Sequence, residues 1–127
     1  MRAGTKQWLE VAESDYKVSL LLFKYAHHPQ AVYAICQAIE KILKAAQIEF
    51  ANTRPKKIHQ LKTIAQEAGL SFSQEHYKTL KELSRHYSKV RYPDFARMEY
   101  NTQAKVGPII SQGKEIYLWI LSKFNSH

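Results

Sequence analysis

Residues 30–50 read QAVYAICQAIEKILKAAQIEF, and the spacing of their apolar side chains predicts a helix. Apolar residues recur three and four positions apart along this segment, as they do on the buried face of a helix. They are Val32, Ile35, Cys36, Ile39, Ile42, Leu43, Ala46 and Phe50. Because they spread over more than half of the circumference, we expect this helix either at the centre of a bundle or against a second subunit.

The segment before this helix has the same periodicity. From Thr5 to about Tyr25, apolar residues again recur at spacings of three and four, with charged residues between them. This pattern predicts one long helix with a single apolar face. We expect that helix to end at His27-His28-Pro29, because proline pushes the residue before it out of the α region.

Two shorter helices are predicted downstream. A basic loop over residues 51–57 precedes a helix that carries Ile58 and Leu61 and closes at Gly69, since glycine commonly ends helices. Ser73 is a candidate N-cap of the next helix, because a serine oxygen can accept hydrogen bonds from the first free backbone N–H groups.

A third long helix is predicted at the end of the chain. It starts near Asn101 or Thr102, and Gly107-Pro108 predicts either a kink in it or a later start. Residues 84–101 before it show no clean period, and no segment has the alternation of a strand. The sequence therefore predicts one all-α domain over residues 1–127, an antiparallel up-and-down bundle of three long and two shorter helices.

Charge is the unusual feature of the composition. The chain has 19 Lys and Arg against 11 Asp and Glu, which gives a formal net charge of +8 with His neutral. Hydrophobic residues make up 45% of the chain, which is ordinary for a globular domain and excludes general disorder. A basic balance attracts anions, so nucleotides, RNA and other phosphate-rich partners fit it. The alternative is a basic surface that has no ligand.

Cysteine and histidine usage excludes several classes of site. Cys36 is the single cysteine, and we expect it to be buried in a reducing compartment. The six histidines lack the spacing of metal ligands, so no metal site is predicted. No glycine-rich phosphate loop or dinucleotide fingerprint occurs, so no cofactor is expected. Without a signal peptide pattern or a run of 18 apolar residues, we expect a cytoplasmic protein without a membrane partner.

The segment from residue 85 to residue 100 concentrates the candidate functional side chains. Its candidates are Arg85, His86, Tyr87, Arg91, Tyr92, Asp94 and Arg97. Arginine side chains bind phosphate through planar forks, tyrosines stack on bases, and a histidine moves protons near neutral pH. Arg85 and His86 are neighbours on a helix and point about 100° apart, so they cannot both face one ligand. The alternative is a loop that Tyr packing and Arg–Asp pairs hold in place.

A second basic group lies at the start of the third predicted helix. It comprises Arg54, Lys56, Lys57 and His59, and the backbone N–H groups of a helix start also attract anions. The interpretation we favour is that His59 caps or packs against that helix. Asp15 and Glu40 lie near apolar helix faces, where we expect buried hydrogen bonds or interhelical pairs with Lys or Arg rather than catalysis.

Five short elements occur in an order and spacing that resemble a known family. They are WLEVAESDY at residues 8–16, QAIEKILKA at 37–45, HQL at 59–61, RYPD at 91–94 and YLWI at 117–120. Together they resemble the HEPN domain family (higher eukaryotes and prokaryotes nucleotide-binding), over nearly the full length of the chain. The resemblance implies an up-and-down helical bundle that pairs as a homodimer, with a cleft at the subunit seam.

The resemblance also implies partners and an activity. Many prokaryotic members are encoded with a small nucleotidyltransferase and form toxin–antitoxin pairs, in which the HEPN chain is a metal-independent ribonuclease. Those members carry Arg, four to six residues and then His, late in the bundle. This chain departs from that pattern, because His86 precedes Arg91 and the literal spacing occurs only at Arg54 to His59, in an early loop. The departure favours binding of nucleotide or RNA over cleavage.

Three functions therefore stand as hypotheses. The preferred one is an interaction module that forms a homodimer, acts with a small nucleotidyltransferase and binds nucleotide or RNA phosphates in a basic cleft. The second is a metal-independent endoribonuclease in which Arg85 or Arg91 stabilises the transition state and His86 moves the proton. The third is a structural dimerisation bundle without catalysis, whose basic surface is incidental.

Overall fold

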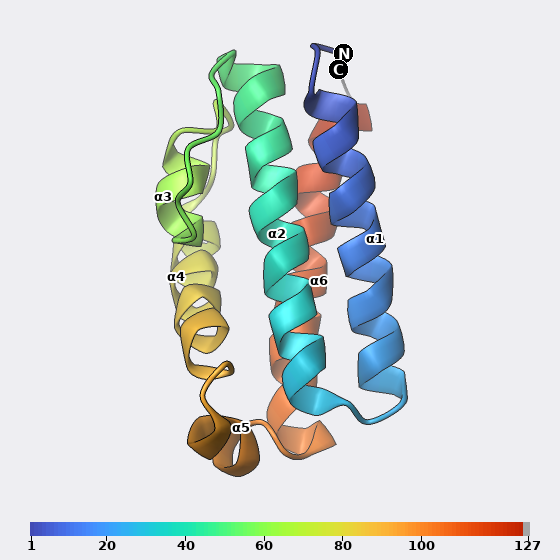
Figure 1. Ribbon diagram of the computed structural model, residues 1–127. Coiled ribbons are helices and arrows are strands. Elements are labelled where there is room, and N and C mark those ends of the chain that lie inside the picture. The colour runs from blue at the N-terminus through green and yellow to red at the C-terminus, as the bar shows by residue number, and fades with distance from the viewer. Residues whose placement is uncertain (126–127) are drawn as a thin grey trace.

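The computed structural model describes residues 1–125, which contain six α-helices and no strand (Figure 1). The helices are α1 (Thr5–Lys24), α2 (His28–Ala51), α3 (Leu61–Gln66), α4 (Gln74–Lys89), α5 (Pro93–Glu99) and α6 (Gln103–Asn125). The predicted all-α bundle is confirmed. The start of α1 and the end of α6 lie at one end of the bundle, and α5 lies at the other.

The helix α2 is the centre of the fold. It packs against α1, α3, α4 and α6, and most of its residues are buried, including every apolar position that its sequence period marked except the partly buried Phe50. Of the two placements that the broad apolar surface allowed, the central one is observed. Its charged residues Glu40 and Lys44 are buried as well. Glu40 contacts Tyr87 of α4 and His59 of the loop before α3, whereas the Lys44 ammonium lies over the Trp8 ring of α1.

The turn between α1 and α2 differs by a few residues from the prediction. Helix α1 ends at Lys24, and α2 already begins at His28 with Pro29 in its first turn. Proline is well placed there, because the N–H group that it lacks would have no partner within the helix. The sequence His27-His28-Pro29 therefore marks the start of α2 more than the end of α1.

The connections around α3 follow from individual residues. Helix α3 spans only Leu61–Gln66, so Ile58 lies in the loop before it. Gly69 has a φ of +75°, and a Cβ atom there would lie 2.7 Å from the Phe50 carbonyl oxygen, so only glycine fits. Ser73 caps α4 as predicted, since its hydroxyl accepts a hydrogen bond from the backbone N–H of His76.

The predicted number of five helices is wrong for the described residues. Residues 84–101 show no clean period in the sequence, and no helix of their own was predicted after the end of the fourth one, but they hold the end of α4 and the whole of α5. Helix α5 has no buried residue, so it leaves no apolar period in the sequence. Its local features are Pro93 at the start, Asp94 in the first turn and Arg97 in the last, which suit the helix dipole.

The last helix begins at Gln103, close to the predicted start. The alternative of a later start is wrong, because Gly107 and Pro108 lie inside α6. Pro108 is the sixth residue of the helix, and it is exposed, so its ring does not disturb the packed face. None of the helices within residues 1–125 has both the length and the apolar character that a membrane span requires.

Candidate functional site

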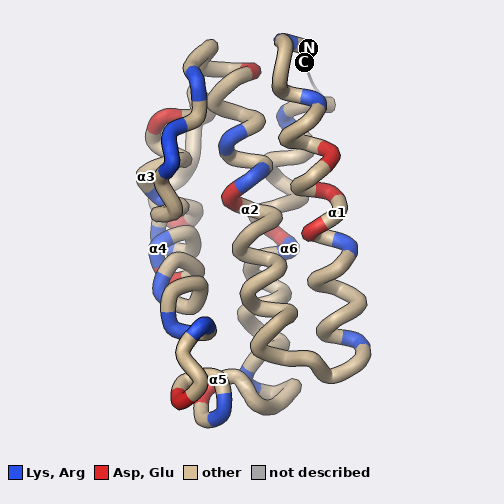
Figure 2. Tube along the Cα trace, viewed as in Figure 1, with Lys and Arg blue, Asp and Glu red and all other residues tan. Residues whose placement is uncertain are grey.

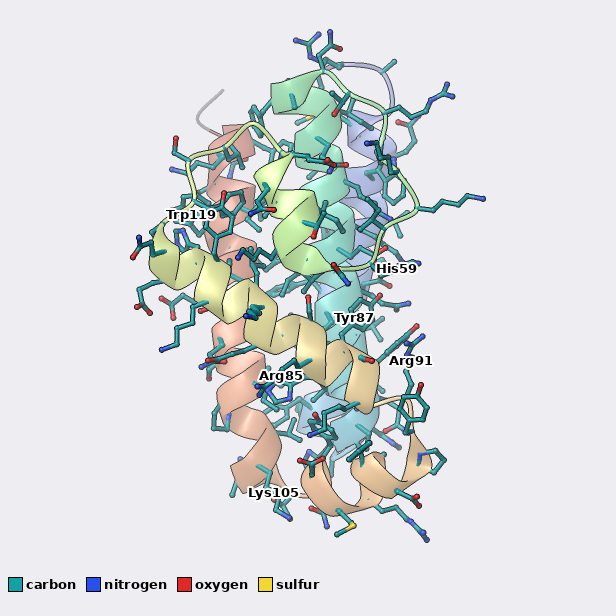
Figure 3. All side chains as sticks on the ribbon, turned by 90° about the vertical axis from the view of Figure 1, so that its left-hand side faces the viewer. His59, Arg85, Tyr87, Arg91, Lys105 and Trp119 are labelled. Atoms are coloured by element: carbon teal, nitrogen blue, oxygen red, sulfur yellow. The ribbon has the colours of Figure 1, made fainter. Side chains whose placement is uncertain are left out.

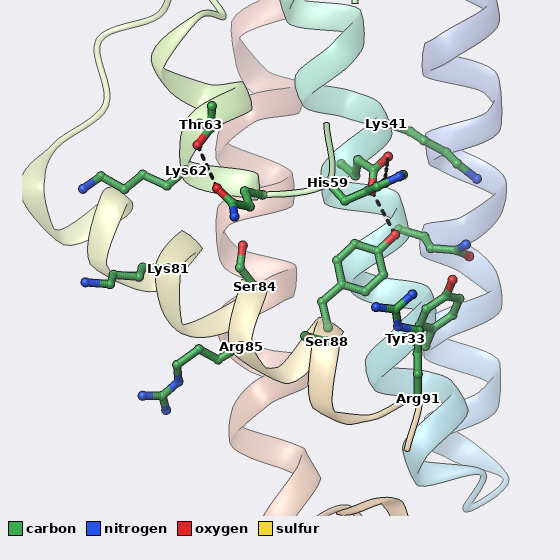
Figure 4. Close-up of a pocket in the computed structure, with 14 residues that line it drawn as sticks. Tyr33, Lys41, His59, Lys62, Thr63, Lys81, Ser84, Arg85, Ser88 and Arg91 are labelled. Carbon is green, nitrogen blue, oxygen red and sulfur yellow. Dashed lines mark hydrogen bonds and ion pairs between the residues drawn. The ribbon is translucent and has the colours of Figure 1, made fainter. Parts of the chain in front are cut away.

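A cavity of about 890 Å³ lies between α2, the loop over residues 52–60, α3 and α4 (Figure 4). It is lined by Tyr33, Gln37, Glu40, Lys41, His59, Gln60, Lys62, Thr63, Lys81, Ser84, Arg85, Tyr87, Ser88 and Arg91. Its volume lies within the range of about 300–1,000 Å³ that small-molecule sites occupy in proteins.

One face of α4 forms a wall of the cavity. Lys81, Ser84, Arg85 and Ser88 lie three and four positions apart and therefore share that face. Ser84 also fixes the neighbouring helix, since its hydroxyl accepts a hydrogen bond of 3.0 Å from the backbone N–H of Leu61, the first residue of α3. The buried Leu80 and Leu83 hold α4 on the core, so the wall has a rigid support.

The floor of the cavity is built on the carboxylate of Glu40, whose side chain is 7% exposed. Lys44 donates to its Oε2 at 2.9 Å, and the Tyr87 hydroxyl donates to its Oε1 at 2.9 Å. The Nδ1 of His59 lies 3.0 Å from Oε1 and 3.1 Å from Oε2. Glu40 thus joins side chains from α2, α4 and the loop before α3.

These three partners keep Glu40 charged. Burial by itself raises the pKa of the carboxyl, but the hydrogen bonds from Lys44, His59 and Tyr87 outweigh it and hold the pKa below its usual value. The His59 imidazole is 73% exposed, so it reaches from the buried carboxylate toward water. Because Nδ1 faces a carboxylate, we assign the proton of the neutral ring to Nδ1, which leaves Nε2 as an acceptor.

Two tyrosines form the aromatic part of the cavity. The ring centres of Tyr33 and Tyr87 lie 5.2 Å apart with an interplanar angle of 60°. Burial and the nearby Glu40 carboxylate raise the pKa of the Tyr87 hydroxyl, which therefore keeps its proton and donates it to Glu40. Such rings offer π-faces on which a base can stack.

The electrostatic balance of the cavity is positive. Among its lining residues Glu40 is the one acid, and it is already paired. Lys41 is paired as well, since its Nζ lies 2.6 Å from Asp15. Lys62, Lys81, Arg85 and Arg91 also line it, and none of the four forms an ion pair within residues 1–125. Figure 2 shows basic residues along the side formed by α3 and α4.

The structure brings four of the predicted site residues to this one cavity. His59, Arg85, Tyr87 and Arg91 all line it, and Figure 3 shows them on the same side of the molecule. In Figure 4, Arg85 extends on one side of the cavity, whereas His59 and Arg91 lie on the other. Cationic side chains therefore lie on both sides of the cavity, Arg85 on one side and Arg91 on the other.

His86 is not among the residues that line the cavity. Its Nδ1 lies 2.8 Å from the hydroxyl of the buried Tyr100, and the two rings meet edge to face. Burial and the neighbouring Arg85 and Lys89 lower the pKa of His86, which favours the neutral ring. The predicted divergence of Arg85 and His86 is confirmed, because Arg85 lines the cavity and His86 bonds to Tyr100.

The remaining candidates are not brought to the cavity. Arg97 lines a second, more open cavity of about 880 Å³ between α1, α2 and α5, to which Arg91 also contributes. Tyr92 and Asp94 are exposed and line neither cavity, and the Asp94 carboxylate lies 3.9 Å from the Arg97 guanidinium. The exposed Arg54 and Lys57 of the loop over residues 52–60 also line neither cavity.

Several residues of the cavity escaped the sequence analysis. Lys62, Lys81 and Tyr33, which line it, were not singled out, nor was Lys44, which binds Glu40, and Glu40 was expected only as a structural acid. One signal was available for Glu40 and Lys44, because two charges four positions apart occurred within the apolar part of the central helix. The expectation of buried hydrogen bonds or interhelical pairs is confirmed, because Asp15 of α1 pairs with Lys41 of α2 and the buried Glu40 is hydrogen-bonded to Lys44. Among the described residues, no three His, Cys, Asp or Glu side chains are grouped to hold a metal ion.

Comparisons with known proteins agree on the fold. The chain is similar to TT1696 from Thermus thermophilus, a solved structure, with a TM-score of 0.80 and 20% sequence identity. The similarity covers 94% of this chain and 97% of that chain. No curated protein sequence matches. The family model described as the HEPN domain matches residues 5–123, from the first residue of α1 almost to the end of α6, and the chain therefore belongs to the HEPN domain family.

Proposed function

We propose that this HEPN protein binds the phosphate groups of a nucleotide or RNA in the cavity between α2, α3 and α4. Four cationic side chains line the cavity without ion pairs among the described residues, and this observation carries the proposal; they are Lys62, Lys81, Arg85 and Arg91. Glu40, the one acid among the lining residues, already has the Lys44 ammonium as its counter-ion. Unpaired cations that share a concave site repel one another, and an anion between them relieves that repulsion. Guanidinium groups add planar, two-pronged hydrogen bonding to phosphate.

The aromatic part of the cavity favours a nucleotide over inorganic phosphate. Tyr33 and Tyr87 lie beside the cationic groups, and Tyr87 is held in place by its bond to Glu40. A base stacked on one of these rings would place its phosphates toward Arg91. RNA cleavage by an Arg–His86 pair has less support, because Tyr100 occupies the Nδ1 of His86.

We also propose that the chain acts as a homodimer together with a small nucleotidyltransferase, in the manner of a toxin–antitoxin pair. Membership of the HEPN family supports this part of the proposal. The neighbouring open reading frame gives the first test. If it encodes a nucleotidyltransferase, co-expression of the two chains should yield a complex that elutes together in size-exclusion chromatography. Separate elution at micromolar concentrations would count against the partnership.

Binding of ATP and of a short single-stranded oligoribonucleotide tests the cavity. In calorimetric titrations we expect the double variant Arg85→Gln/Arg91→Gln to bind about a hundredfold more weakly than the wild type, since each charge-assisted contact contributes about 1.5–3 kcal/mol. Tyr33→Ala should weaken binding about tenfold by removing a stacking surface. The affinity of the wild type should also fall as the salt concentration rises.

A matched control separates the cavity from the general charge of the molecule. Lys6→Gln/Lys114→Gln removes the same two charges from exposed positions on α1 and α6, away from the cavity. Binding by this variant should stay within about threefold of the wild type. Equal losses in the two double variants would show that any binding is due to the net charge, and the proposal would then be wrong. Absence of binding by the wild type would also contradict it.

A further inference from the structure

Helix α1 carries a row of apolar side chains on its outer surface. Val11 is 45% exposed, Val18 43%, Leu21 55% and Tyr25 64%. Their spacings of seven, three and four residues place them on one stripe, and Gln7 and Ser14 complete the a and d positions of three heptads. Four large apolar side chains exposed along one face of a helix, with only Gln7 and Ser14 as polar positions among them, indicate a contact with another helix.

That contact is not made within the described part of the chain. The residues of α1 that pack on the core are the small and fully buried Thr5, Ala12 and Ser19, which let α1 approach α2 closely. At 100° per residue they lie about 135° round the helix from the exposed stripe. Tyr16 stacks on Tyr117 of α6, with their ring centroids 4.2 Å apart. Helix α6 therefore also contacts α1 on the side away from the exposed stripe. Both neighbours of α1 thus leave the stripe uncovered.

We propose that the stripe is covered by the same stripe of a second copy of this chain, with the two α1 helices antiparallel. The inference rests on the homodimer part of the proposed function and specifies the surface that forms it. In the antiparallel register, Val11 of one copy packs against the partner's Leu21, and Val18 packs against the partner's Ser14. The partner's Tyr25 then covers Gln7, so that each end of the stripe is closed by an aromatic ring.

The charges beside the stripe select this direction. Glu10 and Lys24 occupy the same flanking heptad position, one at each end of the stripe. In the antiparallel register, Glu10 faces the partner's Lys24 and Lys24 faces the partner's Glu10, which gives two attractive pairs. A parallel pair would instead place Glu10 beside the partner's Asp15, and like charges at that position oppose it.

At the centre of the antiparallel register, residues of like charge face each other across the two copies. Each of these charges is already paired with an opposite charge in its own chain. Lys17 faces the partner's Lys17, but each is paired with Glu13 of its own chain at 2.8 Å. Asp15 faces the partner's Asp15, but each is paired with Lys41 of its own chain at 2.6 Å. The attractive pairs at the two ends therefore set the direction without strong opposition at the centre.

Charge reversal with rescue tests the register. Sedimentation equilibrium of the full chain from about 5 to about 500 µM should show a monomer–dimer equilibrium. Lys24→Glu should raise the dimer dissociation constant about tenfold, because it places like charges at both ends. The double variant Glu10→Lys/Lys24→Glu restores opposite charges and should return the constant to within about threefold of the wild type. Leu21→Asn should weaken the dimer at least as much as Lys24→Glu, through lost apolar contact.

Lys114→Glu is the matched control, since it reverses an exposed charge on α6 and should leave the dissociation constant unchanged. A monomer throughout the concentration range overturns both this inference and the proposed homodimer. If the dimer dissociation constant is unchanged in Lys24→Glu and Leu21→Asn, the α1 surface alone is wrong. The same holds if Glu10→Lys/Lys24→Glu does not return the constant toward the wild-type value. Binding of ATP or the oligoribonucleotide, measured on the same variants, should stay at the wild-type level. Absence of such binding by the wild type would contradict the cavity proposal, but it would not affect the proposed dimer surface.

Discussion

Glu40 places a negative charge in the interior, and at the residue scale its partners explain why it is tolerated. Three donors from different elements satisfy its two oxygens, and Lys44 supplies the balancing charge from the next turn of α2. A buried ion pair of this kind adds little net stability, because the desolvation of both charges offsets their attraction. Its effect is positional, since one carboxylate fixes His59 and Tyr87 at the edge of a cavity.

His86 gives a prediction for the pH dependence of stability. Its pKa is lowered in the folded chain, chiefly by burial, whereas an unfolded histidine has a pKa of about 6.5. A group whose folded pKa is depressed contributes stability above its unfolded pKa, and that contribution is lost as the pH falls toward the folded value. We therefore expect the free energy of unfolding of the wild type to decrease from about pH 7.5 to about pH 5, as measured by urea denaturation.

The variant His86→Asn isolates this contribution, because asparagine keeps an acceptor close to the Tyr100 hydroxyl but does not titrate. Burial raises the pKa of Tyr100 to about 12, so its hydroxyl remains a donor throughout this pH range. The decrease over that range should be smaller in the variant than in the wild type. The other histidines are unchanged, so they cancel in the comparison. Parallel curves for the two proteins would contradict the assignment.

At the scale of elements, α6 packs on α2 through a glycine. A Cβ atom at Gly113 would lie 2.6 Å from Cγ1 of Ile35, a β-branched and fully buried residue of the central helix. The close approach of the two helices therefore depends on the missing side chain. Gly107, more than a turn earlier, is different, because a Cβ there would meet only the end of the Phe23 ring at an ordinary 3.7 Å.

These two glycines predict opposite responses to alanine. Gly113→Ala should lower the free energy of unfolding by about 1–3 kcal/mol, because the added methyl overpacks the contact between α2 and α6. Gly107→Ala should change it by between zero and a gain of about 1 kcal/mol, since alanine favours the helix but the following Pro108 opposes a Cβ there. Chemical denaturation measures both. Equal effects at the two positions would mean that α6 does not approach α2 as described.

At the scale of the whole molecule, the net charge of +8 is unevenly distributed. Figure 2 shows basic residues following one another along the side of α3 and α4, and the cavity lies on that side. Like charges gathered on one side of a compact molecule destabilise it, and anions bound there restore the balance. Binding of an anion at the cavity, as proposed, would therefore stabilise the entire bundle.

This linkage predicts specific stabilisation by a polyanion. Tripolyphosphate at about a hundred times its dissociation constant should raise the free energy of unfolding by about 2.7 kcal/mol. Sodium chloride at equal ionic strength should give less, because it only screens the charges. In Arg85→Gln/Arg91→Gln the two salts should act alike. Thermal unfolding followed by circular dichroism measures the difference, and an undiminished response of the variant to tripolyphosphate would contradict a site in the cavity.

How far the sequence predicted each element depended on how much of that element is buried. Helix α2 has an apolar period over its whole length, and α4 has a serine cap, so both were located within a few residues. Helix α5 was missed because none of its residues is buried. The same reason applies to the site, where Arg85, Tyr87 and Arg91 stood out by their clustering and Lys62 and Lys81 looked like ordinary surface charges.

By itself the sequence determined the helical class of this protein, the broad apolar surface of residues 30–50 and the divergence of Arg85 from His86. Each of these follows from the repeat of about 3.6 residues per turn of the helix, which is local. Only the tertiary structure decided that Glu40 meets both His59 and Tyr87, and that Arg85 and Arg91 share a cavity with Lys62. Those groupings depend on how α2, α3 and α4 pack against one another, and such packing joins side chains that no spacing along the chain connects.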